Sequence, residues 1–216
     1  MKNFIILPTY NEKENIGLLI DEIFSLLPEI SILVVDDSSP DGTAAAVEKM
    51  IIRYPNLSLL KRPEKNGLGG AYIAGFKKLL ANSDIKNIFM MDADFSHSPK
   101  YISQMLKESK NYGLVIGSRY VNGGSIAKWE LWRRILSAGG NTYVRLVLGR
   151  KIHDWTGGFN CINVKYLRKV NLDKVDFSGY AFIMGLKYFL IKAGISIKEI
   201  PIIFEARRGG ESKMSG

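Results

Sequence analysis

Carboxylate side chains follow three short hydrophobic runs in the first half of the chain, at Glu12, at Asp36 and Asp37, and at Asp92 and Asp94. Carboxylates that meet at one edge of a sheet repel one another unless a cation or a hydrogen-bonding ligand lies between them. Mg²⁺ and Mn²⁺ prefer oxygen ligands, and Mg²⁺ is usually bound through one or two carboxylates together with substrate phosphates. Asp92 and Asp94 therefore predict a site for Mg²⁺ or Mn²⁺.

The hydrophobic runs alternate with stretches of helical periodicity, which is typical of a mostly parallel sheet with helices on both faces. We expect strands over residues 4–7, 31–35, 57–60, 88–91 and 114–117. We expect helices near residues 16–27, 43–54 and 70–80, and a further helix beginning with Ser98 as N-cap and Pro99 as first residue. Ligands of such sheets bind at the carboxyl ends of the strands, where the acidic residues would lie. The fold class expected is one α/β, Rossmann-like domain.

The second half is less regular, with predicted helices over about 129–148 and 179–193 and a last strand over 196–205. With 216 residues and 46% hydrophobic content, the chain can bury one large core. The single Cys161 excludes an intramolecular disulfide. We expect neither a secretory signal nor a transmembrane domain, because no apolar run approaches the length that a spanning helix requires.

Positive charge is concentrated in the second half of the chain. Residues 1–118 contain 13 basic and 14 acidic residues, a net charge of −1, whereas residues 119–216 contain 17 basic and 7 acidic residues, a net charge of +10. Such an excess favours contact with phosphates or anionic lipid headgroups. Nucleic acid is a weaker candidate, since the chain has no helix-turn-helix, zinc-finger or RNA-binding signature.

A dinucleotide-binding site is disfavoured, because the turn after the first predicted strand reads PTYNE and has no G-x-G-x-x-G pattern. The glycines within residues 66–70 follow the third predicted strand and lack the lysine spacing of a P-loop. Two interpretations of these glycines stay open: a turn that begins a helix, or a contact to a phosphate or a base.

Several short segments occur in the order typical of the dolichyl-phosphate (polyprenyl-phosphate) mannosyltransferases, which the chain resembles over nearly its whole length. These segments are PTYNE (8–12), VDDSSPDGT (35–43), RPEKNGLGG (62–70), DADFSH (92–97), GSRY (117–120) and GESK (210–213). The resemblance implies an inverting glycosyltransferase of GT-A fold that transfers mannose from GDP-mannose to a polyprenyl phosphate. It divides the chain into a nucleotide-sugar-binding half, residues 1–118, and an acceptor-binding half, residues 119–216.

The resemblance also implies a role for each matching position. Donor-binding residues would be Pro8, Tyr10, Glu12, Val35, Asp37, Asp92, Ala93, Asp94, Arg207 and Lys213. Metal ligands would be Asp92, Asp94 and Ser96. The acceptor phosphate would contact Arg119, Arg133 and Ser137, and the catalytic residues would be Asp94, Arg119 and Arg133. These assignments agree with chemistry, since arginine donates paired hydrogen bonds to phosphate and lysine provides a compact positive charge.

The implied acceptor decides the mechanism, because a lipid phosphate is already ionised at neutral pH and needs no general base. The protein would align the two substrates and stabilise the departing diphosphate. His97 as a base or metal ligand is therefore the less favoured interpretation, and His153 is expected to be structural.

Two alternatives stay open. One is a related enzyme that uses UDP-glucose or another sugar nucleotide. The other is a non-catalytic binder of nucleotide sugar or lipid phosphate, which is suggested by Ala138, Asn160 and Gly185 at positions where relatives carry polar or charged residues. In either case we expect a cytoplasmic protein attached peripherally to the membrane by its basic half, with or without a membrane-anchoring subunit.

Overall fold

The computed structural model describes residues 1–127, 129–175, 177 and 179–207. The strands are β1 (Lys2–Thr9), β2 (Ser31–Asp36), β3 (Leu57–Lys61), β4 (Ile85–Met90), β5 (Leu114–Ser118), β6 (Ser125–Ile126), β7 (Asn160–Asn163), β8 (Ile197–Pro201) and β9 (Ile203–Phe204). The helices are α1 (Lys13–Leu26), α2 (Thr43–Ile51), α3 (Gly67–Leu80), α4 (Ile102–Glu108), α5 (Leu131–Leu148), α6 (Val164–Leu167) and α7 (Gly179–Lys192). Short 3₁₀ helices, η1 (Pro99–Tyr101) and η2 (Leu172–Lys174), complete the described elements.

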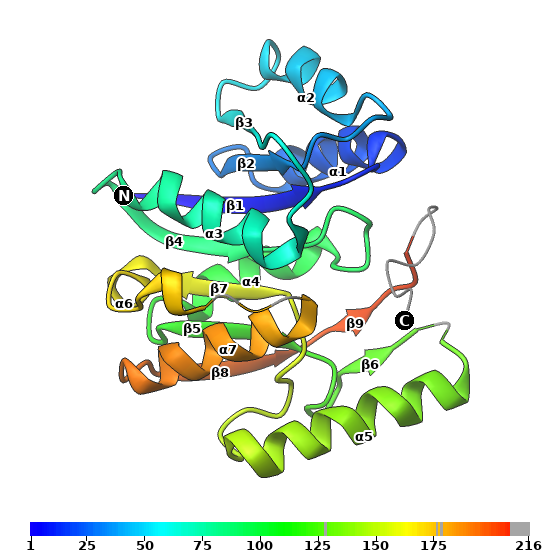
Figure 1. Cartoon of the computed structure of the whole chain (residues 1–216), viewed down its shortest axis with the longest axis vertical. Helices are drawn as coiled ribbons and strands as arrows, with labels where there is room; N and C mark the ends of the chain where they lie inside the picture. The colour runs from blue at the N-terminus through cyan, green and yellow to red at the C-terminus, as the bar shows by residue number, and fades with distance from the viewer. Residues whose placement is uncertain (128, 176, 178, 208–216) are drawn as a thin grey trace.

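In the described part of the chain the main sheet has seven strands in the order β3-β2-β1-β4-β7-β5-β8, and β6 pairs with β9 in a separate ribbon (Figure 1). β7 pairs antiparallel with β4 and β5, whereas the other neighbours in the main sheet are parallel. The expected α/β fold is thus confirmed.

Alternating side chains of the strands build a core on each face of the sheet. In β1, Ile6 packs with the helices α3 and α7 on one face, while Ile5 and Leu7 pack with α1 and α4 on the other. These strands are hydrophobic throughout because helices cover both faces. The layers hold the carboxyl ends of β1, β2 and β4 at one edge of the molecule (Figure 1).

The second half differs from the sequence prediction in two places. β7 was not predicted, since its four residues, Asn-Cys-Ile-Asn, carry little strand pattern. The expected strand over 196–205 is divided at Ile202, whose N–H donates to the carbonyl of Ser118 while its carbonyl accepts from the N–H of Ser125. Before this residue the chain pairs with β5 as strand β8, and after it the chain pairs with β6 as strand β9.

Helix α5 lies along the outer edge of the molecule beyond β8 (Figure 1). It begins at Leu131, two residues later than expected, and Asn141 is its one fully buried residue. Among the described residues, no helix combines the length and apolar character needed to span a membrane.

Candidate active site at the carboxyl ends of the strands

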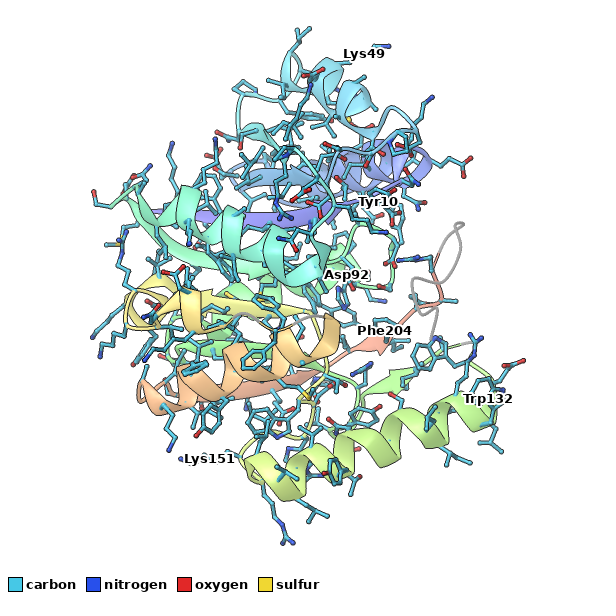
Figure 2. All side chains as sticks on the ribbon, in the orientation of Figure 1. Tyr10, Lys49, Asp92, Trp132, Lys151 and Phe204 are labelled. Carbon is cyan, nitrogen blue, oxygen red and sulfur yellow. The ribbon has the colours of Figure 1, made fainter. Side chains whose placement is uncertain are left out.

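The loops that follow β1, β2 and β4 each contain one residue other than glycine in the left-handed backbone region. These residues are Asn11 (φ 57°), Ser38 (φ 53°) and Phe95 (φ 64°). Such a conformation costs about 1–3 kcal/mol at a residue other than glycine, and strain of this kind is concentrated at functional sites. Tyr10 and Asp92 both lie on the side of the molecule where the strands end (Figure 2).

Asp94 is buried at the end of β4 and is held by groups that favour its charged form. Its Oδ1 accepts hydrogen bonds from the hydroxyl and the N–H of Ser96, at 2.6 and 3.0 Å, and its Oδ2 accepts from Nε of Arg207 at 2.7 Å. Burial alone would raise the pKa of Asp94, but the hydrogen bonds from Ser96 and Arg207 outweigh it and lower the pKa. Asp94 is therefore a carboxylate at neutral pH.

Arg207 connects the carboxylates of two strand ends. Its Nη2 lies 3.8 Å from Oε1 of Glu12, which follows β1, while its Nε contacts Asp94. The predicted meeting of acidic residues is thus confirmed for Glu12 and Asp94, and the Arg207 guanidinium lies between them. A positive group here is also suited to donor phosphates, as expected for Arg207. Lys213, the other residue expected at the donor phosphates, lies outside the described residues.

The donor set at this edge fits a hard divalent cation. Asp92 follows the same strand as Asp94, and its side chain is one-third exposed. No group of three or more His, Cys, Asp and Glu side chains that could hold a metal occurs in the ranges that the structure describes. Two carboxylates suffice when substrate phosphates supply further oxygens, as is usual for Mg²⁺. The hydroxyl of Ser96 bonds Asp94, so it supports this carboxylate whether or not it ligates a metal.

The ends of β1 and β2 form the part of the site expected to bind the nucleoside. Pro8 and Val35 are partners in the register of these two strands. The buried Asp37 accepts from Nη1 of Arg62 at 2.7 Å and from the N–H of Asn66 at 3.3 Å. Arg62 was given no role by the sequence, although it lies within one of the family segments.

Other features of this region have structural explanations. Lys65 places its Nζ 4.0 Å from the ring centroid of Tyr10. A Cβ on Gly69 would lie 2.8 Å from the carbonyl oxygen of Phe177, so close packing of α3 requires glycine there. The structure thus favours a packing role for this glycine over a contact to a phosphate.

Arg119 is fixed in a buried ion pair at the end of β5. Its Nε and Nη2 donate to the two carboxylate oxygens of Asp154, both at 2.8 Å, and Nη2 also donates to Thr156 Oγ1 at 2.7 Å. Burial would raise the pKa of Asp154, yet the hydrogen bonds and charge of Arg119 lower it. Arg119 thus has an anchoring partner that the sequence did not predict.

The other predicted acceptor residues lie on α5. Ser137 Oγ is 2.6 Å from the hydroxyl of Tyr120, and the guanidinium of Arg119 lies 5.2 Å from the Tyr120 ring centroid. Arg133 lies four residues before Ser137, on the same side of the helix. Its side chain is 54% exposed, and its Nε is 3.6 Å from Glu130. The structure therefore connects Arg119 with Ser137 and places Arg133 one turn away.

Aromatic side chains lie between the acidic edge and Arg119. Phe204 lies between Asp92 and Trp132 in Figure 2, and its ring is 5.4 Å from that of His97 and 5.5 Å from the Arg119 guanidinium. His97 is buried and accepts the N–H of Asp92 at its Nδ1 at 3.0 Å. Burial lowers the pKa of His97, although Asp92 opposes this effect. The contacts give His97 the role of fixing the Asp92 backbone, while His153 pairs with Glu199 at 2.8 Å.

Comparison with known proteins identifies the family. The sequence pattern of "Glycosyl transferase family 2" matches residues 4–170, more than half of the chain. The chain belongs to glycosyl transferase family 2. It is 42% identical to polyprenol monophosphomannose synthase of Mycolicibacterium smegmatis over 217 residues, which covers 100% of this chain and 82% of that protein. It is 40% identical to undecaprenyl-phosphate mannosyltransferase of Micrococcus luteus, covering 100% and 88% of the two chains.

Solved structures show the same fold for this family 2 glycosyltransferase. Mannosyltransferase PcManGT from Pyrobaculum calidifontis, in complex with GDP-Man and Mn²⁺, superimposes with a TM-score of 0.63. The superposition covers 95% of this chain and 56% of that chain, at 17% identity. At this identity the likeness establishes the architecture alone.

Proposed function

We propose that this glycosyltransferase transfers mannose from GDP-mannose to a polyprenyl phosphate with inversion at the sugar carbon. The observation that carries the proposal is the full-length identity of 42% and 40% to two proteins named for the attachment of mannose to a polyprenol monophosphate and to undecaprenyl phosphate. The site supports it, because an acidic edge suited to a metal and a donor lies beside a buried arginine suited to a second phosphate.

The protein's own contribution to the reaction is charge and alignment. Tyr10, Asp37 and neighbouring residues of β1 and β2 would bind the nucleoside. Asp92 and Asp94 would hold Mg²⁺ or Mn²⁺, which when bound neutralises charge on the donor diphosphate and the leaving group. Arg207 would add hydrogen bonds to the same phosphates.

Arg119, Arg133 and Ser137 would bind the acceptor phosphate, whose ionised oxygen attacks the sugar without a general base. Because two phosphate-bearing substrates repel each other, the site must supply positive charge on both sides of the transferred sugar. Arg207, at the acidic edge, and Arg119, at the end of β5, would supply this positive charge.

A transfer assay with radiolabelled donors tests the proposal. With polyprenyl phosphate and Mn²⁺, GDP-mannose should give a labelled lipid and UDP-glucose should give none. The anomeric configuration of the product, read by NMR, should be opposite to that of the donor. Product from UDP-glucose alone would support a glucosyltransferase instead, and donor binding without any product would support a non-catalytic binder.

We further propose that the protein attaches peripherally to a membrane surface through α5. Large apolar side chains on this helix are 58–71% exposed: Leu131, Trp132, Ile135, Leu136, Tyr143, Leu146 and Val147. They recur along its whole length with helical periodicity and form one stripe, which we call the α5 apolar face. Arg133 and Arg134 flank this face, and a helix of this composition is suited to lie in the interface of a membrane with anionic lipids. A cytoplasmic location and a membrane-anchoring subunit stay predictions.

Replacing Trp132 and Ile135 with serine should weaken binding to vesicles by roughly a hundredfold, because burying each side chain contributes at least about 1.5 kcal/mol. Cosedimentation with vesicles containing anionic lipid measures the effect at low and high salt. The control is Ile52→Ser, which removes a side chain 89% exposed at the end of α2, on the opposite side of the molecule from α5. If the double variant bound as the wild type did, and salt alone released both, basic side chains rather than the α5 apolar face would hold the protein.

A further inference from the structure

Lys187 is a fully buried cation on α7 that contacts one loop three times. Its side chain is 1% exposed, and Nζ donates to the carbonyl oxygens of Asp154 at 2.7 Å, Gly157 at 2.9 Å and Trp155 at 3.2 Å. An ammonium group has three N–H donors, so these carbonyls match its full capacity. Lys187 therefore ties residues 154–157 to the helix.

The loop of residues 154–157 lies between Arg119 and the acidic edge of the candidate site. Asp154 accepts the side chain and the N–H of Arg119, and its Oδ1 also accepts the N–H of Gly157. At the other end of the loop, a Cβ on Gly158 would lie 3.9 Å from the carboxylate oxygens of Asp92. The position of the loop thus decides where the Arg119 guanidinium lies relative to the acidic edge.

Lys187 also balances charge. Two carboxylates with buried side chains, those of Asp154 and Glu199, interact electrostatically with Lys187. The carboxylate oxygens of Glu199 also accept the N–H groups of His153 and Asp154. With Arg119 and Lys187 the cluster of four has no net charge. Without Lys187 the remaining three groups would have a net charge of −1, because the charge of Asp154 is already balanced by Arg119 and that of Glu199 is not. A cluster with a net negative charge repels a phosphate.

Stability alone does not account for this lysine. Burial lowers the pKa of Lys187 to about 8, although Asp154 and Glu199 act to raise it. The ammonium form therefore predominates at neutral pH at an energetic cost, and buried ion pairs are often no more stabilising than apolar side chains of similar volume.

We propose that Lys187 is a positioning residue for acceptor binding, which holds the 154–157 loop and offsets the charge of Glu199 so that Arg119 attracts a phosphate. The inference rests on the proposed function. It assigns specificity for an anionic acceptor to a group that touches neither substrate.

The test is a charge-balance cycle built from K187M, E199Q and their combination. K187M should raise the acceptor KM about tenfold, because it removes a positive charge near Arg119, and should leave the donor KM within about twofold, because Asp94 and Arg207 are unchanged. E199Q alone should lower the acceptor KM. The double variant restores neutrality and should return the acceptor KM to within about threefold of wild type.

A purely structural role predicts the reverse, because each substitution removes hydrogen bonds from the same loop. An E199Q variant with a raised acceptor KM, or a double variant worse than both single variants, would overturn the proposal. E199Q tests it even if K187M fails to fold. Leu190→Ala, at a buried position of the same helix, is the control: it should lower Tm without changing the acceptor KM.

Failure of the proposed function and failure of the role of Lys187 give different results. A wild-type protein that transfers no sugar to polyprenyl phosphate would reject that function. Calorimetric binding of farnesyl phosphate and of inorganic phosphate to the same variants would then test the charge balance directly. The proposal requires K187M to weaken, and E199Q to strengthen, the binding of both probes, and unchanged affinities would overturn it.

Discussion

Asp94→Asn should lower kcat by at least about a thousandfold, a loss of about 4 kcal/mol of transition-state stabilisation. Asparagine keeps the size of the side chain and an oxygen that can accept from Ser96. It removes the negative charge that a metal ligand needs and that Arg207 contacts at 2.7 Å. The fold should be retained, so the loss belongs to the chemistry.

Initial rates at saturating GDP-mannose over a range of Mn²⁺ concentrations measure this loss. Titration of Mn²⁺ with and without GDP shows whether the metal requires both the carboxylate and the nucleotide. Asp41→Asn is the matched control, since Asp41 accepts only backbone and hydroxyl hydrogen bonds from Lys13 and Thr43. A variant at Asp94 with near wild-type kcat and unchanged Mn²⁺ affinity would remove Asp94 from the metal site.

Asp154→Ala should lower the free energy of unfolding by about 3–5 kcal/mol, because it leaves the buried Arg119 without its paired carboxylate. The control is Asp173→Ala, which removes an ion pair with Lys77 of similar length, 2.6 Å, between exposed side chains. That pair should contribute only about 0–1 kcal/mol. Urea unfolding at pH 7 measures both, and similar losses in the two variants would contradict the buried ion pair.

The same carboxylate predicts a pH dependence. The pKa of Asp154 is lowered in the folded protein, so the unfolded chain binds its proton first as the pH falls. The stabilisation is complete above the ordinary aspartate pKa of about 3.9 and is lost as the pH falls through the folded pKa. Wild type should therefore lose more stability than Asp154→Asn between about pH 5 and pH 2.

The first half of the fold and the acidic edge could be predicted from the sequence. Hydrophobic runs with helical stretches between them are local signals, and parallel pairing then brings Glu12 and Asp94 to one edge, where Arg207 contacts both. The predicted strand ends were close enough to the observed ones for Asp92 and Asp94 to be named as the proposed metal ligands. A helix over about residues 129–148 was also expected, but only the structure shows that large apolar side chains of α5 are exposed in the described part of the chain.

The second half could not be predicted in the same way, because its organisation depends on distant contacts. Arg119 pairs with Asp154, 35 positions later, and the carbonyls of that loop are bound by Lys187, 33 positions later still. A buried ion pair leaves no periodic signal in the sequence. β7 was missed for a related reason, since its burial comes from its place between β4 and β5 rather than from a hydrophobic sequence.

The position of β7 has a consequence for biosynthesis. β4 and β5 both pair with β7, which lies between them in the main sheet and begins 42 positions after the end of β5. During translation, the edges of β4 and β5 that face β7 therefore stay unpaired until α5 and β7 have been synthesised. In the described chain both sheet partners of β5, β7 and β8, come after α5. Unpaired edges rich in isoleucine, phenylalanine and valine favour association with other chains. The nascent protein should thus depend on chaperones most strongly before residue 160 emerges from the ribosome.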